Sequence, residues 1–283
     1  IKESLLQSFY IQSYEKFYKW DKFEIRLFYR YRAGYLPTKF VDAILSFYED
    51  KTKLKGVAGK ESEYLAGKEN VNACYGMTVT DILRDLIMYD PEHVDENGDL
   101  KPWFNDPVNR QQAIDKYNTN PQRFLFYPWG VFVTSYARRN LFTGILECGT
   151  DYIYADTDSL KILNYEKHRE YFDTYNKNIF KRLKKACDYH GFSYDRISPK
   201  TIKGIEKPLG VWDDETKDLR GGVYPVFKTL GAKRYMYLAD NVLHTTVAGA
   251  NKEKTAKYLT DTYGKYGAFY AFTNNLTIPK SHS

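Results

Sequence analysis

The sequence predicts an α+β protein, and three observations support this class. Apolar residues recur at helical spacing in several long segments, and short apolar runs flank a polar turn in the middle of the chain. The chain also has 283 residues, of which 43% are hydrophobic and 17% aromatic. This supply of apolar side chains is enough for the core of one large domain or of about two to three subdomains.

The helical pattern is clearest in several segments, which we expect at about 37–55, 60–75, 128–148, 166–189 and 252–263. Pro37 and Pro128 suit the first turns of their helices. Gly56 and Gly59 separate the first two helices, which are therefore expected to form a helical hairpin. Gly76 is expected to end the second helix as a C′ glycine.

Strands are expected around a polar turn and again near the end of the chain, at 152–154, 160–163, 223–229, 233–238 and 242–248. Residues 1–32 are expected to form a helix followed by a strand at 24–32. Residues 81–120 are polar and rich in turn residues, which favours an insertion that folds as a compact protruding subdomain.

The charge and the cysteines narrow the class of protein. The chain carries 42 Lys and Arg against 36 Asp and Glu, a net charge of +6 that is compatible with a phosphate-rich partner without identifying one. Cys74, Cys148 and Cys187 are odd in number and lack CxxC spacing, so neither a disulfide framework nor a cysteine zinc site is expected. The cysteines instead favour reduced, packed thiols in a cytoplasmic protein. No apolar run reaches membrane-spanning length, so we expect no membrane partner.

Asp156 and Asp158 are the strongest candidates for a catalytic or metal-binding site in the sequence, because one residue separates them in a turn between two strands. Their carboxylates could converge on a hard cation such as Mg²⁺, which prefers oxygen ligands and leaves positions open for water and phosphate. Such a pair suggests two-metal phosphoryl transfer. The alternative is that Asp and Ser simply favour turns. The apolar flanking strands are expected to bury this turn, which would favour a bound cation.

A stripe along the second helix combines cations with aromatic and amide groups. It consists of residues three or four apart, namely Lys60, Tyr64, Lys68, Asn72 and Tyr75. Cations for phosphates and rings for a sugar or base suit a nucleoside triphosphate. An ordinary surface helix with its tyrosines packed inward remains the alternative.

These two features occur together in a known family. Lys68-Glu-Asn-Val-Asn72-Ala-Cys-Tyr75-Gly76 resembles the fingers motif Kx3NSxYG of family B DNA polymerases, and Tyr154-Ala-Asp156-Thr-Asp158-Ser159 resembles their palm motif YxDTDS. Lys233-Arg234-Tyr235 resembles the KxY motif that contacts the primer terminus. Ala73 stands where the family usually has Ser, and Cys74 where it has an apolar residue.

The resemblance is closest to the protein-primed branch, found in tailed phages and linear plasmids. Lys207-Pro-Leu-Gly-Val-Trp212 and Val247-Ala-Gly249 are similar to segments of that branch. It implies a palm built on an antiparallel sheet, helical-hairpin fingers and the start of a thumb. The resemblance implies five parts. Residues 1–36 would be the end of an upstream palm or insertion region, 37–80 the helical-hairpin fingers, and 81–120 an insertion like the second terminal-protein region. Residues 121–208 would be the palm, and 209–283 the palm–thumb junction with the early thumb.

The resemblance implies a role for each matching residue. Asp158 would be a ligand of both catalytic metals, two Mg²⁺ or Mn²⁺ ions, with Asp156 as the second acid. Lys68 would hold the dNTP triphosphate, while Asn72 and Tyr75 shape the pocket of the nascent base pair. Lys60 has no motif counterpart, and its phosphate role rests on helical phase alone. The primer and DNA contacts would be Lys233, Tyr235, Arg234, Ser159 and Thr157.

The implied partners are primer–template DNA, dNTPs and a terminal priming protein, in a bacterial cytoplasm if a phage encodes the chain. No Dx2SLYP string, which supplies a further palm aspartate in the family, precedes Pro37. The proofreading carboxylates are not found either, so we expect a catalytically incomplete portion that needs an upstream segment. The alternatives are an RNA-templated polymerase or reverse transcriptase, and a non-catalytic subunit that binds nucleic acid by charge and stacking.

Overall fold

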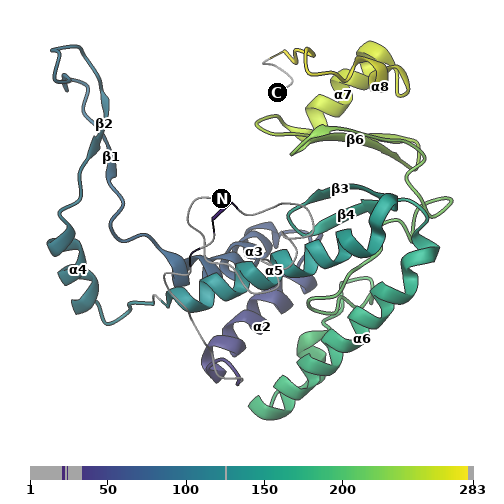
Figure 1. Ribbon diagram of the computed structural model, residues 1–283, viewed down its shortest axis with the longest axis horizontal. Coiled ribbons are helices and arrows are strands. Elements are labelled where there is room, and N and C mark those ends of the chain that lie inside the picture. Colours follow the sequence, from purple (N-terminus) through teal and green to yellow (C-terminus); the bar gives the residue numbers. More distant parts are fainter. Residues whose placement is uncertain (1–20, 23, 25–33, 125, 280–283) are drawn as a thin grey trace. The chain divides into compact units, whose positions relative to one another are not determined.

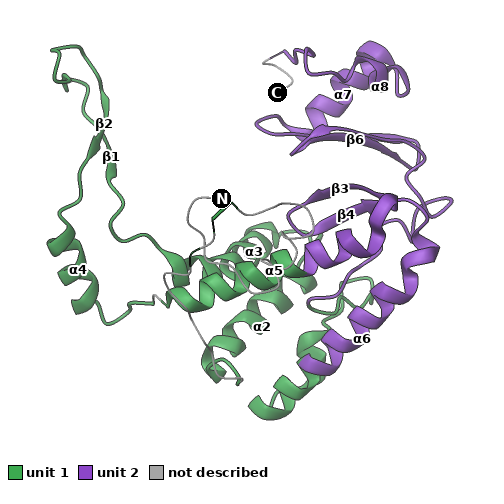
Figure 2. Cartoon of the chain, in the orientation of Figure 1, with its two compact units in different colours: residues 1–139, 183–209 green, residues 140–182, 210–283 purple. Residues whose placement is uncertain are grey.

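The computed structural model describes residues 21–22, 24, 34–124 and 126–279. These residues form a mixed helical and antiparallel-sheet fold, which confirms the α+β class (Figure 1). The chain divides into two compact units: unit 1 comprises 1–139 and 183–209, and unit 2 comprises 140–182 and 210–283 (Figure 2). The helix and strand expected in residues 1–32 fall almost wholly outside the described residues.

Unit 1 is built around a helical hairpin, as the sequence predicts. The hairpin consists of α2 (Thr38–Lys53) and α3 (Glu61–Gly76). The two helices approach closely at Gly67, which is buried and where an added Cβ would lie 3.2 Å from the backbone nitrogen of Lys51. A larger side chain at this position would therefore separate the helices.

A second contact of α2 comes from the 3₁₀ turn η3 (Tyr194–Ile197). Arg196 on η3 donates to the carboxylate of Asp42 over 2.6 Å and to the hydroxyl of Ser46 over 2.8 Å. Glu49, one turn further along α2, lies 3.4 Å from the same guanidinium. One arginine thus joins η3 to three successive turns of α2.

The polar insertion forms a ribbon and a short helix. The ribbon pairs β1 (Leu86–Tyr89) with β2 (Trp103–Asp106), and α4 (Arg110–Thr119) follows. None of residues 81–120, all of which the structure describes, is buried. The expected compact subdomain is therefore wrong: the apolar side chains of the ribbon, such as Leu86 and Ile87, stay exposed, and two strands with a polar helix form no core of their own.

Two long helices continue from one unit into the other. They are α5 (Tyr127–Cys148) and α6 (Tyr165–His190), and both agree closely with their predicted ranges. The 3₁₀ turns η1 (Met77–Val79) and η2 (Gly149–Asp151) lie before α4 and after α5 along the chain. Among the described helices, none combines the length and apolar character that crossing a bilayer requires.

Unit 2 contains the predicted hairpin and a three-stranded sheet. The hairpin pairs β3 (Tyr152–Asp156) with β4 (Ser159–Ile162). The sheet has the order β5–β6–β7, with strands Phe227–Gly231, Arg234–Ala239 and Val242–Val247. The first of these begins later than predicted, since Pro225 lacks the N–H that a ladder bond would need.

The core of unit 2 lies on one face of the three-stranded sheet, against α7 (Lys252–Tyr263) and α8 (Gly267–Ala271). Its buried members are Met236, Leu238, Leu243, Leu259, Ala268, Phe269 and Phe272. Met236 and Leu238 point into this core, so by strand alternation Tyr235 and Tyr237 face the opposite side. The opposite side carries the candidate site.

One predicted helix end is wrong. Gly76 has a helical φ of −54° and is the last residue of α3 rather than a left-handed C′ glycine. The chain continues directly into η1, where the hydroxyl of Thr78 donates to the carbonyl of Tyr75 over 2.7 Å. Because a side chain and a 3₁₀ turn satisfy the terminal carbonyls, no left-handed cap is needed.

A matched pair of glycine substitutions tests the packing of unit 1. An added Cβ on Gly130 would lie 2.0 Å from Cγ1 of Val79, whereas one on Gly76 would meet nothing within 4 Å. We expect Gly130→Ala to lower the free energy of unfolding by about 1–3 kcal/mol through overpacking. Gly76→Ala should raise it by about 0.5–1 kcal/mol through helix propensity. Urea unfolding followed by circular dichroism measures both, and a stabilised Gly130→Ala would contradict the packing.

Candidate functional site

The acidic turn between β3 and β4 is tight and held by its own backbone. Thr157 and Asp158 form its two-residue loop, with Thr157 in the left-handed region at a φ of 55°. The backbone N–H of Asp158 donates to the carbonyl of Asp156 over 2.6 Å, and the hydroxyl of Ser159 donates to the same oxygen over 3.2 Å. The turn therefore holds both aspartates in one short loop.

The expectation that this turn is buried is wrong. Thr157 and Asp158 are exposed, and Ile153 on the preceding strand is 42% exposed, because one face of the hairpin lies open. Asp158 has no ion-pair or hydrogen-bond partner for its carboxylate among the described residues. Its carboxylate is thus available to an external ligand.

Asp156 is the paired member of the two acids. Its carboxylate lies 3.1 Å from Nζ of Lys233, and its side chain is 19% exposed. Burial acts to raise the pKa of Asp156, but the hydrogen bond and charge of Lys233 and the hydroxyl of Thr157 outweigh it and hold the pKa below its usual value. The same pair raises the pKa of Lys233. Asp156 is therefore a carboxylate with a cation already beside it.

Tyr154 provides the second link between these segments. Its hydroxyl accepts a hydrogen bond from the backbone N–H of Lys233 over 3.0 Å, and its ring centroid lies 5.1 Å from that of Tyr235. Tyr154 is buried, while Lys233 has a left-handed φ of 54°. The buried hydroxyl thus stabilises a backbone conformation that a lysine rarely adopts. The YxDTDS-like and KxY-like segments, 79 positions apart at these residues, are joined directly.

A groove of about 630 Å³ opens beside this junction in unit 2. Ser159 and Lys161 of β4, Tyr235 of β6 and the outer strand β7 line it, together with one face of α7. Its cationic side chains are Lys161, Lys252, Lys257 and Lys265, and its acidic ones are Glu215, Glu253 and Asp261. The ring of Tyr237 stacks on His244 at 5.0 Å along the same wall. The groove thus combines charged side chains with aromatic ring surface.

The predicted nucleotide-binding residues belong to unit 1. Lys68 and Asn72 are exposed on α3, and no described residue pairs with the ammonium of Lys68. Tyr64 and Tyr75 are half-buried. Lys60 lies at the N-cap with a non-helical φ of −115°, and Glu63 pairs with it at 2.7 Å. The helix therefore presents Lys68 and Asn72 together, while Lys60 is engaged locally.

Two of the remaining predicted DNA contacts have partners within unit 2. Arg234 donates to the side-chain oxygen of Asn274 over 2.9 Å, and Thr157 donates to the carboxylate of Asp156 over 3.0 Å. Arg234 remains exposed. These contacts position the side chains without removing them from solvent.

The donor set at the turn fits a hard divalent cation. Asp156 and Asp158 supply only carboxylate oxygens, which Mg²⁺ prefers, and Mg²⁺ commonly takes one or two carboxylates and completes its shell with water and phosphates. In the part of the chain that the structure describes, no group of three or more acidic, His or Cys side chains could hold a metal. The carboxylate of Asp158 has no protein partner among the described residues, whereas Lys233 already neutralises the carboxylate of Asp156.

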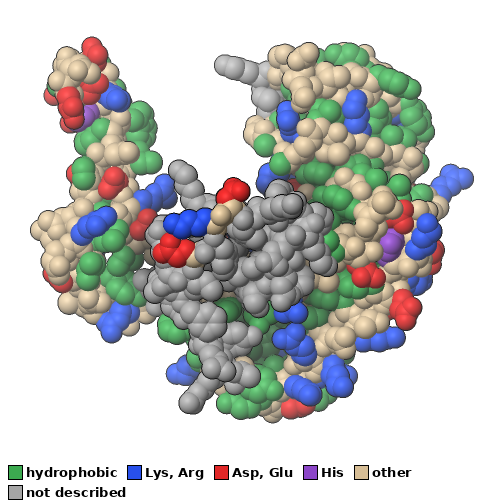
Figure 3. Space-filling view, viewed as in Figure 1, with side chains coloured by type: hydrophobic (Ala, Val, Ile, Leu, Met, Phe, Trp, Pro, Cys, Tyr) green, Lys and Arg blue, Asp and Glu red, His purple; other side chains and the backbone are tan. Residues whose placement is uncertain are grey.

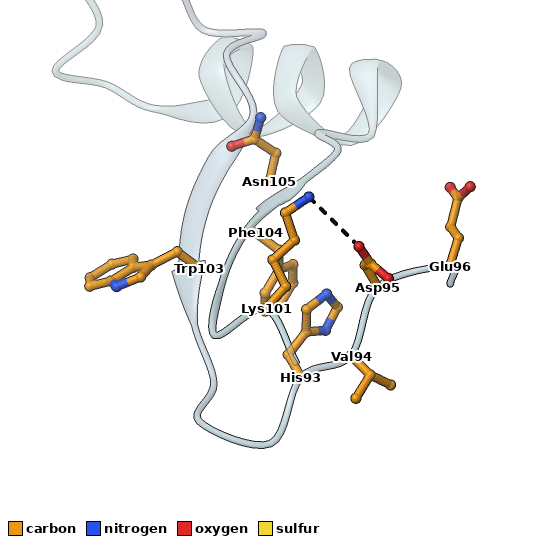
Figure 4. Close-up of a pocket in the computed structure, with 8 residues that line it drawn as sticks. All are labelled: His93, Val94, Asp95, Glu96, Lys101, Trp103, Phe104 and Asn105. Carbon is orange, nitrogen blue, oxygen red and sulfur yellow. Dashed lines mark ion pairs between the residues drawn. The ribbon is translucent and has the colours of Figure 1, made fainter. Parts of the chain in front are cut away.

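A different cavity, of about 430 Å³, lies at the tip of the insertion ribbon (Figure 4). There His93 stacks on Phe104 at 3.7 Å, and Nζ of Lys101 extends to within 3.9 Å of Asp95. Backbone N–H groups hold the pKa of Asp95 below its usual value. Trp103 projects away from this group (Figure 4). The contacts stabilise a turn, and none of the predicted site residues lies there.

Sequence reasoning missed the roles of two residues. Tyr154 belongs to the YxDTDS-like segment, but nothing in the sequence indicates that its hydroxyl holds the backbone of Lys233. Lys252 at the start of α7 acts electrostatically on Asp156 and lines the groove. Both roles depend on contacts between distant segments, which spacing along one element does not reveal.

Comparison of the chain with models of protein families, with curated proteins and with solved structures finds no match.

The ion pair of Asp156 gives a titration test. We expect Lys233→Gln to raise the pKa of Asp156, because burial then acts without its main opposing cation. Carbon-13 NMR of the aspartate carboxyls measures the shift. Lys252→Gln is the matched control and should raise this pKa less, since Lys252 makes the smallest of the favourable contributions. Equal shifts in the two variants would contradict the pairing.

The same pair predicts how stability depends on pH. Because the pKa of Asp156 is lowered in the folded protein, the stabilisation is present above its ordinary value of 3.8 and is lost as the pH falls through the lower folded value.

Proposed function

We propose that the chain is part of a template-directed DNA polymerase that transfers nucleotides from dNTPs to a primer 3′-hydroxyl. The observation that carries the proposal is the junction of Lys233 with Asp156 and Tyr154. Two segments that separately resemble polymerase motifs meet within hydrogen-bonding distance. A chance resemblance in either segment would not require this contact.

The side chains of the turn suit the chemistry of nucleotidyl transfer. Asp158, which is exposed and has no partner among the described residues, would hold Mg²⁺ together with Asp156. Bound Mg²⁺ supplies Lewis-acid activation and charge neutralisation in reactions of this class. Lys233 limits the repulsion between the two aspartates by neutralising one of them.

The groove beside the turn suits a nucleic-acid strand. Tyr235 forms part of its wall, and Lys252 and Lys257 of α7 line it beside Glu253 and Asp261, while Lys161 of β4 already pairs with Glu215 at 2.9 Å. Lys233 Nζ is near the carboxylate but its side chain is 59% exposed, so it can also contact a phosphate at the primer end. Stacking surface and cations together favour a strand over a small uncharged ligand.

The helical hairpin of unit 1 has the character of a nucleotide-binding element. Lys68 and Asn72 share one exposed face of α3, and the ammonium of Lys68 is free to meet a triphosphate. In the proposed enzyme the hairpin is the fingers, unit 2 carries the palm chemistry, and residues 81–120 are the insertion. The proposal includes an upstream segment with a further aspartate and a terminal protein as priming partner.

A second candidate is a nucleic-acid-binding portion without catalysis of its own. The engagement of Asp156 by Lys233 favours it, since a carboxylate that already has a cation competes less well for a metal. The lack of a third acidic ligand within the described residues favours it as well. In this case the groove and its lysines would bind a strand while another polypeptide supplies the chemistry.

Substitution of the open aspartate tests the proposed function. We expect the 283-residue chain to bind a primer–template alone and to support extension once a polypeptide supplying the Dx2SLYP-type aspartate is present. Under those conditions Asp158→Asn should lower extension about 100-fold or more, since even supporting residues around a metal contribute about 10–100-fold. Primer–template affinity, measured by fluorescence anisotropy, should change little.

Asp173→Asn on α6 is the control, because it removes the same charge from an exposed position outside the turn. Equal extension by the wild type and Asp158→Asn would exclude the metal role. Binding of primer–template without extension under any condition would favour the second candidate. A wild type that does not bind primer–template would contradict both.

The role of Lys68 predicts a separate effect on nucleotide use. We expect Lys68→Ala to raise the dNTP concentration for half-maximal extension about tenfold, as loss of one charge-assisted hydrogen bond of about 1.4 kcal/mol implies. Lys53→Ala on α2 is the control, because Lys53 already pairs with Glu49 at 3.3 Å. Weaker template binding with unchanged dNTP dependence would show that Lys68 contacts DNA instead.

A further inference from the structure

An exposed row of cations lies on α6, outside the candidate site. It comprises Lys177 and Lys181 in one row and Arg182 about 100° around the helix axis from Lys181, a set that we call the α6 cation stripe. Lys177 and Lys181 lie one turn apart, a rise of about 6 Å along the helix axis. No acidic residue occurs between Asp173 and Asp188 in the sequence. The part of the chain that the structure describes provides no ion-pair partner for any of the three.

Some cations elsewhere in the described part of the chain pair with carboxylates, whereas others, such as Lys68, do not. The described ion pairs of lysine and arginine with nearby carboxylates include Lys53–Glu49, Lys60–Glu63, Lys161–Glu215, Arg169–Glu166, Lys200–Glu206 and Lys217–Asp213. On the N-terminal turns of the same helix Arg169 pairs with Glu166, whereas no described carboxylate pairs with the stripe, although Asp173 lies one turn before Lys177. Figure 3 shows lysine and arginine side chains gathered over the lower part of α6 as it is oriented in Figure 1.

The stripe is unfavourable for the helix by itself. Like charges at spacing i, i+4 repel and destabilise a helix. The opposite face of α6 holds the helix in place: Phe172 is buried, and Asn176 exchanges two hydrogen bonds of 2.8 Å with the backbone of Trp212. On the same side, Cγ2 of Ile179 lies 3.4 Å from the position that a Cβ added to Gly210 would take. These contacts keep α6 folded despite the repulsion among its cations. A bound anionic ligand would reduce that repulsion.

We propose that the α6 cation stripe binds the phosphate backbone of DNA, as a contact region additional to the acidic turn and the groove. The proposal rests on the proposed function for the identity of the polyanion. Cations spaced along a helix neutralise successive phosphates and release their counterions, which gives affinity without sequence preference. The stripe therefore retains the nucleic acid and takes no part in the chemistry.

The charges of the insertion ribbon direct the polyanion away from that element. Residues 86–106 carry a single lysine or arginine, Lys101, and the acidic residues Asp90, Glu92, Asp95, Glu96, Asp99 and Asp106. The ribbon thus repels phosphate, whereas the stripe attracts it. An anionic membrane surface suits the stripe less well, because the apolar face of α6 is already packed and cannot enter a bilayer.

The test compares two triple variants with the same change in net charge. Lys177→Gln/Lys181→Gln/Arg182→Gln removes the stripe. Lys53→Gln/Lys200→Gln/Lys217→Gln removes three exposed cations that carboxylates already neutralise. Fluorescence anisotropy with a labelled duplex and a labelled single strand, each about 20 nucleotides long, gives Kd over a range of salt concentrations for the wild type and both variants.

We expect the stripe variant to weaken binding about tenfold or more at low salt and to reduce the slope of log K against log salt by about 2–3, and the control to change neither. Duplex and single strand should distinguish which form of DNA the stripe holds. Because the substituted side chains are exposed, the thermal unfolding temperatures should stay close to that of the wild type. The stripe variant should be slightly more stable, since it loses the repulsion between Lys177 and Lys181, and the control slightly less stable, since it loses three exposed ion pairs.

Three results would overturn the proposal: equal binding by wild type and stripe variant, equal loss in both triple variants, or binding to phosphatidylserine vesicles that depends on the stripe while DNA binding does not. DNA binding that requires the stripe, in a protein that never extends a primer under any condition, would support the stripe and contradict the polymerase proposal. The stripe proposal and the polymerase proposal can therefore be contradicted independently of each other.

Discussion

The organisation of unit 2 depends on one contact, the hydrogen bond from the backbone of Lys233 to the hydroxyl of Tyr154. It fixes a left-handed residue at the start of β6 and brings its ammonium to Asp156. The tyrosine ring then packs near Phe227 and Tyr235, so the small hairpin is attached to the three-stranded sheet through aromatic contacts. A two-stranded hairpin is marginal in water without such support.

The contact also explains how an exposed acidic turn can be tolerated. Two carboxylates in one short loop repel each other, and the protein places a cation beside one while leaving the other open. This arrangement lets the turn accept an additional positive charge at Asp158 without having to bury an unpaired acid. The turn is therefore an exposed polar site at the edge of the hairpin and not a buried metal-binding site.

Local elements were largely predictable from the sequence because their signals are local. Pro37 and the apolar spacing after it predict α2, which the structure begins at Thr38. The polar turn of Asp156–Ser159 predicts the hairpin, which is observed. The predictions were wrong where contacts with other segments determine the local structure. At Gly76 the turn η1 replaces the expected left-handed cap. The insertion ribbon lacks the core expected of a subdomain. The partners of Asp156 and Tyr154 follow from tertiary packing, which residue spacing does not encode.

The exposed insertion ribbon has a consequence for how the molecule opens. Its strands hydrogen-bond only to each other, and Leu86, Ile87 and Tyr89 remain mostly in solvent. Unfolding this segment exposes little new apolar surface, so its opening free energy lies far below that of the sheet core beneath α7. Amide hydrogens of β1 and β2 should therefore exchange early and independently. The segment around Asn97 and Gly98 is where the chain can best accept a peptide insertion or a protease cut without loss of the remaining fold.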